Sequence, residues 1–164
     1  MNGMERTGSA VSARGEKAEK LFLSGYNCAQ AVFGAFADVT GLPFDTAMRI
    51  ASSLGGGVGR LREICGAVSA AEMVLGAVLG YDTPETGEVK AAHYARVQKL
   101  AYEFKERRGS YVCRELLGVQ GAEGPAPEKR GPAFYASRPC AALVREAAEL
   151  IARTLLEAGR TLNE

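Results

Sequence analysis

Residues 62–76 read REICGAVSAAEMVLG, and this stretch decides the fold that the sequence predicts. Its apolar residues recur at helical spacing, and small residues occupy most positions between them. The resulting helix, expected to reach Gly80, is apolar on nearly all sides, which is typical of a central helix in a bundle. Cys65 falls in its first turn, directly after the glycine-rich segment LGGGVGR at residues 54–60.

Helical signals dominate the rest of the chain as well. Cap residues, prolines and glycines bound further helices at residues 16–24, 27–40, 43–54, 83–110, 111–118 and 140–158. The segment 119–139 is too rich in Gly and Pro for regular structure, and a loop of this length in a compact domain is usually functional or mobile. No strand alternation is evident, so we predict an all-α protein, a bundle of about six to seven helices.

Length and composition are those of a single globular domain. The chain has 164 residues, of which 47% are hydrophobic and 24% charged, and this is enough to build one core. We expect a flexible N-terminal segment at residues 1–15 and one all-α domain at residues 16–164.

Charge and hydropathy argue against two kinds of partner. The net charge of +1 gives no indication of nucleic-acid binding or of an anionic membrane surface. The first residues lack the apolar run of a secretory signal. The most hydrophobic run, residues 64–79, contains Glu72 and is shorter than the roughly 20 residues of a membrane-spanning helix. We therefore expect a soluble cytoplasmic protein without membrane insertion.

The four cysteines all fall at the starts of expected helices. In a reducing cytoplasm, cysteines are more often metal ligands, redox thiols or inert core residues than permanent disulfides. A helix N-terminus carries partial positive charge, which stabilises a thiolate, the form that attacks disulfides and binds soft metals. We therefore interpret four residues as candidate catalytic residues and metal ligands: Cys28, Cys65, Cys113 and Cys140.

The spacing of these cysteines leaves several roles open. The sequence contains no CxxC pair, and His93 is its only histidine, so thioredoxin-like and Cys₂His₂ zinc sites are excluded. An antiparallel bundle can gather helix starts at one end. Four converged cysteines would suit a zinc or iron–sulfur site, whereas two pairs would suit dithiol–disulfide chemistry. Inert core cysteines are the alternative.

The glycine-rich segment before Cys65 does not fit a nucleotide-binding motif. It lacks the Lys-Ser/Thr ending of a phosphate loop and follows no strand, so we interpret it as a tight connection between helices. Glycine N–H groups can approach a sulfur centre closely and tune its potential, and Arg60 and Arg62 are expected to favour a thiolate at Cys65. The candidate cofactor-binding glycines are Gly55, Gly56, Gly57, Gly59 and Gly66.

The segments GYNCAQAV, GGGVGR and CGAVSA, followed by two single cysteines, resemble a family of small proteins described as redox-active and named for the pattern C_GCAxxG_C_C. The resemblance spans about residues 25–140. The central motif departs from the pattern at Ala70, which replaces its final glycine and should loosen a helix contact. The resemblance implies an all-helical domain with a redox or metal centre at Cys28, Cys65, Cys113 and Cys140.

This resemblance also implies a functional context. Related domains occur fused to multihaem electron-transfer proteins or resemble parts of them, which favours an iron–sulfur centre, and family members are often encoded near transporter genes. We expect an oxidoreductase or electron-transfer protein that holds an iron–sulfur cluster, zinc or iron, or that cycles thiol pairs. The redox partner is unknown, a transporter system is one candidate, and small-residue helix faces would permit a homodimer. The alternative is a helical interaction or scaffold module, or a transporter accessory, with structural cysteines.

Overall fold

The computed structural model describes residues 3–84 and 86–163, with side chains from Thr7 onward. The prediction of an all-α fold is confirmed: the described residues form helices and no strand, apart from one isolated bridge between Ile64 and Val112. The helices are α1 (Gly3–Leu23), α2 (Cys28–Ala35), α3 (Ala37–Thr40), α4 (Phe44–Ala51), the 3-10 turn η1 (Ser52–Leu54), α5 (Gly55–Val58), α6 (Gly66–Leu79), α7 (Gly87–Arg108), α8 (Cys113–Leu117), α9 (Pro132–Ser137) and α10 (Cys140–Glu157).

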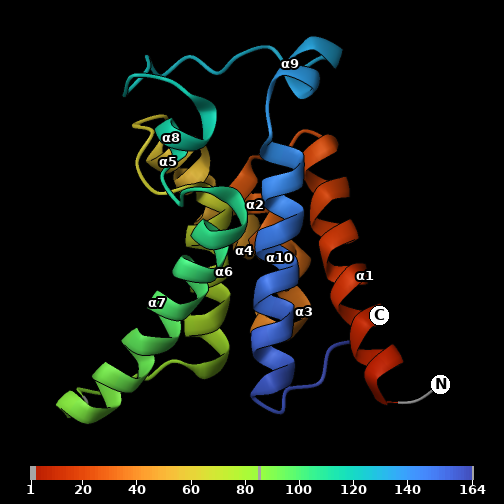
Figure 1. Cartoon of the computed structure of the whole chain (residues 1–164), viewed down its shortest axis with the longest axis vertical. Coiled ribbons are helices and arrows are strands. Elements are labelled where there is room, and N and C mark those ends of the chain that lie inside the picture. Colours follow the sequence, from red (N-terminus) through yellow and green to blue (C-terminus); the bar gives the residue numbers. More distant parts are fainter. Residues whose placement is uncertain (1–2, 85, 164) are drawn as a thin grey trace.

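Helices α2 and α10 form the centre of the bundle. Helix α10 packs against α1, α2, α6 and α7, and α2 packs against α1, α4 and α6. Both chain ends lie at one end of the bundle, whereas α5, α8 and α9 lie at the other (Figure 1). Among the described helices, none has both the length and the apolar character that crossing a bilayer requires.

Helix α6 is less enclosed than its composition predicts. Six of its apolar residues are fully buried, but Glu72 and Met73 lie on a side that is only half covered. The neighbouring α7 buries only Leu100 and Phe104. Its N-terminal half diverges from the bundle, so α7 is buried only toward its C-terminus (Figure 1).

Helix α1 begins much earlier than predicted. The segment 1–15 was expected to be flexible, but it is helical from Gly3 on, whereas the sequence placed the helix start at Glu16. The reason is tertiary, because Ala10, Val11 and Arg14 are buried and α1 packs along α10. Met1 and Asn2 of that segment lie outside the described residues.

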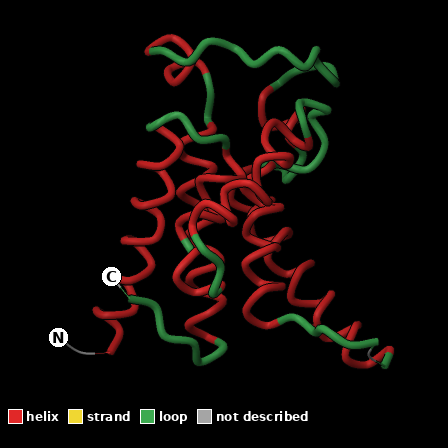
Figure 2. Tube along the Cα trace, turned by 180° about the vertical axis from the view of Figure 1, so that it is seen from behind, coloured by secondary structure: helices red, strands yellow, loops and turns green. Residues whose placement is uncertain are grey.

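Two further differences concern expected boundaries. The helix expected at 27–40 is divided at Phe36, whose φ of −115° departs from helical geometry. The segment 119–139, expected to be irregular, contains the short helix α9, which Pro132 begins at a position where proline is favoured. The loop that leads from α8 to α9 crosses the end of the bundle that lies opposite the chain ends (Figure 2).

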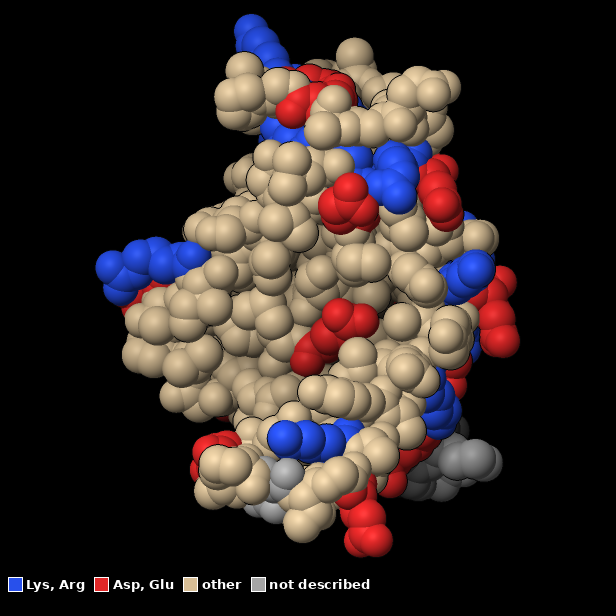
Figure 3. Space-filling model, turned by 90° about the vertical axis from the view of Figure 1, so that its left-hand side faces the viewer, with Lys and Arg blue, Asp and Glu red and all other residues tan. Residues whose placement is uncertain are grey.

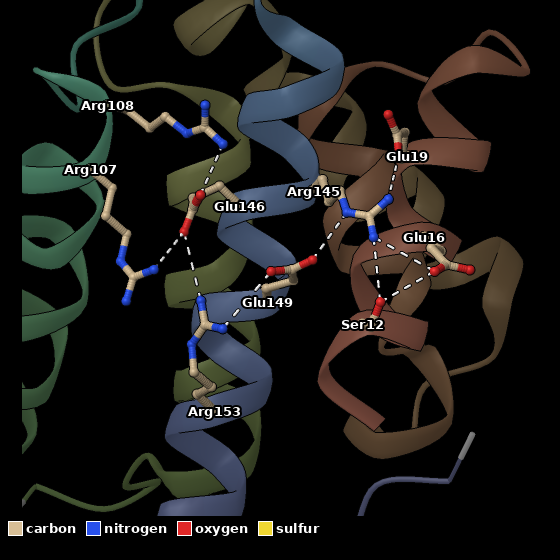
Figure 4. Close-up of polar contacts among 9 residues, drawn as sticks. All are labelled: Ser12, Glu16, Glu19, Arg107, Arg108, Arg145, Glu146, Glu149 and Arg153. Carbon is tan, nitrogen blue, oxygen red and sulfur yellow. Dashed lines mark hydrogen bonds and ion pairs between the residues drawn. The ribbon is translucent and has the colours of Figure 1, made fainter. Parts of the chain in front are cut away.

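Ion pairs connect α10 to its neighbours on both sides (Figure 4). Glu146 accepts from Arg107 and Arg108 at the end of α7. Arg145 donates to Glu19 of α1 at 3.0 Å and to Glu149 one turn further along α10 at 3.1 Å. Such partly exposed pairs contribute about 0–1 kcal/mol each, so they orient the helices more than they stabilise the fold.

Arg14 ties the chain ends to the bundle. Its side chain is only 3% exposed, and its guanidinium donates to Asp38 through both terminal nitrogens at 2.6 and 2.7 Å. It also donates to the backbone carbonyls of Ala35 at 2.7 Å and Asn163 at 3.0 Å. One buried charge thus joins α1, the α2–α3 break and the C-terminal segment.

We expect Asp38→Ala to lower the free energy of unfolding by about 2 kcal/mol, because it removes a charged acceptor from buried Arg14. Arg14 lowers the pKa of Asp38 below its usual value of 3.8. The contribution is therefore present above about pH 4 and is lost as the pH falls through the folded-state pKa. Urea unfolding across pH 3–7 would measure it.

The matched control is Asp45→Ala, which removes the carboxylate of an exposed pair with Arg49 on α4. This substitution should cost no more than about 0.5 kcal/mol. Equal losses for the two variants, or a loss for Asp38→Ala that does not shrink at low pH, would contradict the role assigned to Arg14.

Candidate functional site

The four cysteines share one cavity. It has a volume of about 220 Å³, lies at the end of the bundle near α5, α8 and α9, and is lined by all four candidates: Cys28, Cys65, Cys113 and Cys140. Three of them are the first residues of α2, α8 and α10, and the fourth immediately precedes α6. All are free thiols. The expected placement at helix starts is confirmed, and the fold brings these starts together.

The start of α2 is fixed by reciprocal capping. The Asn27 side chain accepts from the Gln30 N–H at 2.9 Å, and the Gln30 side chain accepts from the Asn27 N–H at 3.1 Å. The Asn27 amide also donates to the Ser52 carbonyl at 2.9 Å. Because Gly55 has no side chain, Asn27 can pack directly against it: a Cβ there would lie 2.5 Å from the Asn27 side chain. Cys28 is therefore held against the glycine-rich segment.

The glycine-rich segment forms a tight loop with an unusual backbone. Gly56, Gly57 and Gly59 have positive φ angles, and so do three residues that carry side chains: Val58, Arg60 and Arg62. A left-handed conformation at a residue other than glycine costs on the order of 1–2 kcal/mol. The predicted tight connection is present.

The five candidate glycines have different positions around the cavity. Gly55 and Gly56 line it. Gly57 lies behind Cys113, because a Cβ at Gly57 would be 2.7 Å from the Cys113 Cβ. Gly66 lies against Cys28, where a Cβ would be 2.7 Å from the sulfur, whereas a Cβ at Gly59 would meet no described atom within 4 Å. Two of the five, Gly57 and Gly66, therefore allow close approach at a cysteine, while Gly55 and Gly56 line the cavity.

A short antiparallel pairing aligns two of the cysteines. The Cys65 N–H donates to the Tyr111 carbonyl at 2.9 Å, and the Cys113 N–H donates to the Glu63 carbonyl at 2.6 Å. Ile64 and Val112 form the bridge between these bonds. The starts of α6 and α8 are consequently fixed to each other, although 48 positions separate their cysteines in the sequence.

Arg62 contacts a different cysteine from the one expected. Its side chain is 3% exposed, and Nη1 donates to the Cys113 sulfur at 3.8 Å. Its Nε donates to Glu123 at 2.5 Å, which anchors the loop after α8. The expectation that Arg62 stabilises a thiolate at Cys65 is therefore wrong, because its guanidinium faces Cys113.

The expectation of low thiol pKa values is also wrong for three cysteines. Burial raises the pKa of Cys65 well above its ordinary value, although the nearby amides of Ala67 and Val68 favour the thiolate. Burial raises the pKa of Cys140 to about 11. Burial also raises the pKa of Cys113, and this outweighs the hydrogen bond from Arg62. The loss of hydration, which raises the thiol pKa, therefore outweighs the partial positive charge of the helix N-terminus, which lowers it.

Sequence reasoning missed part of the cavity wall. The loop 119–139 and α9 contribute Glu128, Arg130, Phe134 and Arg138 to the lining. A signal was available, since Arg138 lies two positions before Cys140 and two further basic residues occur at 129–130. Neither His93 nor Glu72 lines the cavity.

The four cysteines line the cavity without forming a ready site for one metal ion. Among the side chains of residues 7–84 and 86–163, no three Cys, His, Asp or Glu are arranged to hold such an ion. The cavity is enclosed by sulfur atoms, apolar side chains such as Phe22 and Leu143, and arginines. Such a site can hold a group of several atoms on a four-thiol donor set.

An all-α domain whose four cysteines share one cavity is the class of protein that the fold and the site define. Within that class, the chain belongs to the C_GCAxxG_C_C family: residues 26–154 match the family described as "Putative redox-active protein (C_GCAxxG_C_C)". This match confirms the resemblance indicated by the order of the cysteines. Neither a curated protein nor a solved structure matches the chain.

We expect Gly66→Ala to lower the free energy of unfolding by about 2 kcal/mol, because the new Cβ would lie 2.6 Å from the Leu54 carbonyl oxygen and 2.7 Å from the Cys28 sulfur. The displaced sulfur should also change the alkylation rate of Cys28. Urea unfolding and mass-spectrometric labelling would measure the two effects.

The control is Gly76→Ala in the same helix, where a Cβ meets nothing within 4 Å. Alanine there should stabilise α6 by about 0.5–1 kcal/mol, because glycine is a poor helix former. A neutral Gly66→Ala variant with unchanged Cys28 labelling would show that the close approach at Gly66 is not required.

Alkylation of Cys140 in the reduced, metal-free protein should accelerate about tenfold per pH unit up to about pH 11, because only the thiolate reacts and its pKa is raised to about 11. An ordinary thiol levels off near pH 8.5–9. Peptide mapping after timed labelling would separate Cys140 from the other cysteines, with free cysteine as the reference. A plateau near pH 9 would contradict the effect of burial.

Proposed function

We propose that this chain is a redox protein whose four cysteines together hold an iron–sulfur cluster. The observation that carries the proposal is that four cysteines from four separate helix starts line one cavity. The family to which the chain belongs is described as redox-active, which agrees with a shared centre. A four-cysteine donor set is the usual one for such clusters.

The size of the cavity favours a cluster over a single zinc or iron ion. Zinc holds thiolates at about 2.3 Å, so four ligands of one ion would converge closely and leave no room between them. Here the four cysteines line a cavity of about 220 Å³, and no three Cys, His, Asp or Glu side chains among the described residues are arranged to hold one ion. A cluster of several atoms matches a space of this kind better.

The chain's own residues would support such a centre in three ways. Arg62 donates to the Cys113 sulfur, and its positive charge offsets negative charge on the ligands. Apolar side chains, Phe22 and Leu143 among them, line part of the cavity and lower the polarity around the centre. The tight glycine loop keeps backbone close to Cys113. When bound, the cluster would supply one-electron transfer.

High thiol pKa values are compatible with this role. A thiol loses its proton when its sulfur binds a metal ion. Burial disfavours the free thiolate, so the thiols with raised pKa values are neutral until iron binds. The same burial slows attack by a thiolate on a disulfide. Dithiol–disulfide cycling is therefore the less favoured form of the redox function.

The test is anaerobic reconstitution of the reduced chain with iron and sulfide. We expect visible absorbance, with iron and acid-labile sulfide bound in the proportion of a cluster, and a reversible bleaching by dithionite. Each Cys→Ser variant should lose most of the bound iron. Met73→Leu is the control, since it alters a sulfur-bearing side chain on α6 that does not line the cavity.

Two results would overturn the proposal. A chain that binds no iron but forms disulfides on mild oxidation would support dithiol chemistry instead. A colourless chain with inert thiols, whose Cys→Ser variants fold and behave as the parent does, would support the structural alternative in which the cysteines are core residues.

A further inference from the structure

Arginines form a second wall of the cysteine cavity. Arg60, Arg62, Arg130 and Arg138 all line it. The side chains of Arg60, Arg62 and Arg138 are only 19%, 3% and 15% exposed. These charges lie inside the molecule beside the sulfurs rather than on an open surface. Figure 3 shows a mostly uncharged face with basic and acidic side chains close together near its upper end.

Two carboxylates pair with three of these four guanidinium groups. Glu123 pairs with Arg62 and lies 3.5 Å from Arg60. Glu128 pairs with Arg138 and lies 3.9 Å from Arg60. Both carboxylates come from the loop between α8 and α9. The group as a whole therefore carries two positive charges in excess.

Arg130 has no carboxylate partner among the residues that the structure describes. It donates to the backbone carbonyls of Phe22 at 3.0 Å and Tyr26 at 2.8 Å. Its guanidinium carbon also lies 4.8 Å from the centre of the Phe22 ring and 5.4 Å from that of Phe134. These contacts fix its position at the cavity without cancelling its charge.

Glu128 shows that the arginine wall can bind a carboxylate. Its carboxylate lines the cavity itself and pairs with Arg138 while only partly shielded from solvent. Guanidinium groups match the planar geometry of carboxylates and other oxyanions, and their attraction strengthens where water is excluded. A small anion entering beside the loop could therefore replace or join Glu128 on the same arginines.

We propose that the arginine wall binds the oxyanion group of a small molecule beside the cysteines. The ligand class is a compact carboxylate or inorganic oxyanion, held by Arg130 and Arg138 on one side of the cavity. This binding does not rest on the proposed redox function.

Alkylation of the reduced, metal-free full chain tests the anion site. In this reaction a cysteine thiolate displaces iodide, a sulfur–carbon bond forms, and the thiol proton passes to solvent. Iodoacetate carries a carboxylate and iodoacetamide does not. Because both reagents attack the same thiolate, the ratio of their rates cancels the thiol pKa. That ratio is compared with the ratio for a neutral cysteine derivative in solution.

We expect the iodoacetate-to-iodoacetamide ratio to exceed that of the free thiol by on the order of tenfold, since a cleft of one charge sign concentrates opposite ions. Inorganic sulfate should compete and lower the ratio. Arg130→Gln should lower it several-fold, and Arg130→Lys should retain part of the preference. Glu128→Gln should raise it, because the internal competitor is removed.

Arg49→Gln is the matched control, because Arg49 is exposed on α4 and its one ion pair among the described residues is with Asp45. It should leave the ratio unchanged. If Arg130→Gln is shown by circular dichroism to be unfolded, the opposite response of Glu128→Gln decides the question. A ratio equal to that of the free thiol, insensitive to sulfate and to Glu128→Gln, overturns the inference.

The two proposals fail separately. Loss of the anion preference with normal iron and sulfide binding would overturn the arginine site alone. An intact anion preference in a chain that binds no iron would overturn the cluster alone and leave the anion site in place.

Discussion

The antiparallel pairing of residues 63–65 with residues 111–113 is the contact on which the site depends. Two backbone hydrogen bonds, from Cys65 to Tyr111 and from Cys113 to Glu63, fasten the loop before α6 to the start of α8. Without this pairing, α8 would have no fixed position, because it is only five residues long. The pairing also places Arg62 beside Cys113 and so anchors Glu123 and the loop that closes the cavity.

Around that contact, burial and helix polarity act on the thiols in opposite directions. Each helix start offers partial positive charge, yet the pKa values of Cys65, Cys113 and Cys140 are raised, with burial the largest cause. Burial therefore favours the neutral thiol at these three cysteines. The positive charge of the cavity comes from arginine side chains, which keep their protons at any physiological pH.

Much of the fold could be predicted because it rests on local signals. Helical spacing placed α6 and α10, and the cap residue Asn27 placed the start of α2 to within one residue. The early start of α1 could not be predicted, because its polar sequence is helical only through packing on α10 and the burial of Arg14. The break at Phe36 also depends on a distant partner, since Arg14 takes the Ala35 carbonyl.

The sequence by itself determined the helical class, the family, and the position of each cysteine at a helix start, because spacing, caps and motif order are properties of neighbouring residues. Only the tertiary structure decided that the four starts share one cavity, that Arg62 faces Cys113, and that Arg130 and Arg138, which lie between α8 and α10, complete the wall. The burial of the thiols also depends on the tertiary structure, and this burial raises the pKa values of Cys65, Cys113 and Cys140. These features join residues tens of positions apart, and hydration is lost only when the chain has packed.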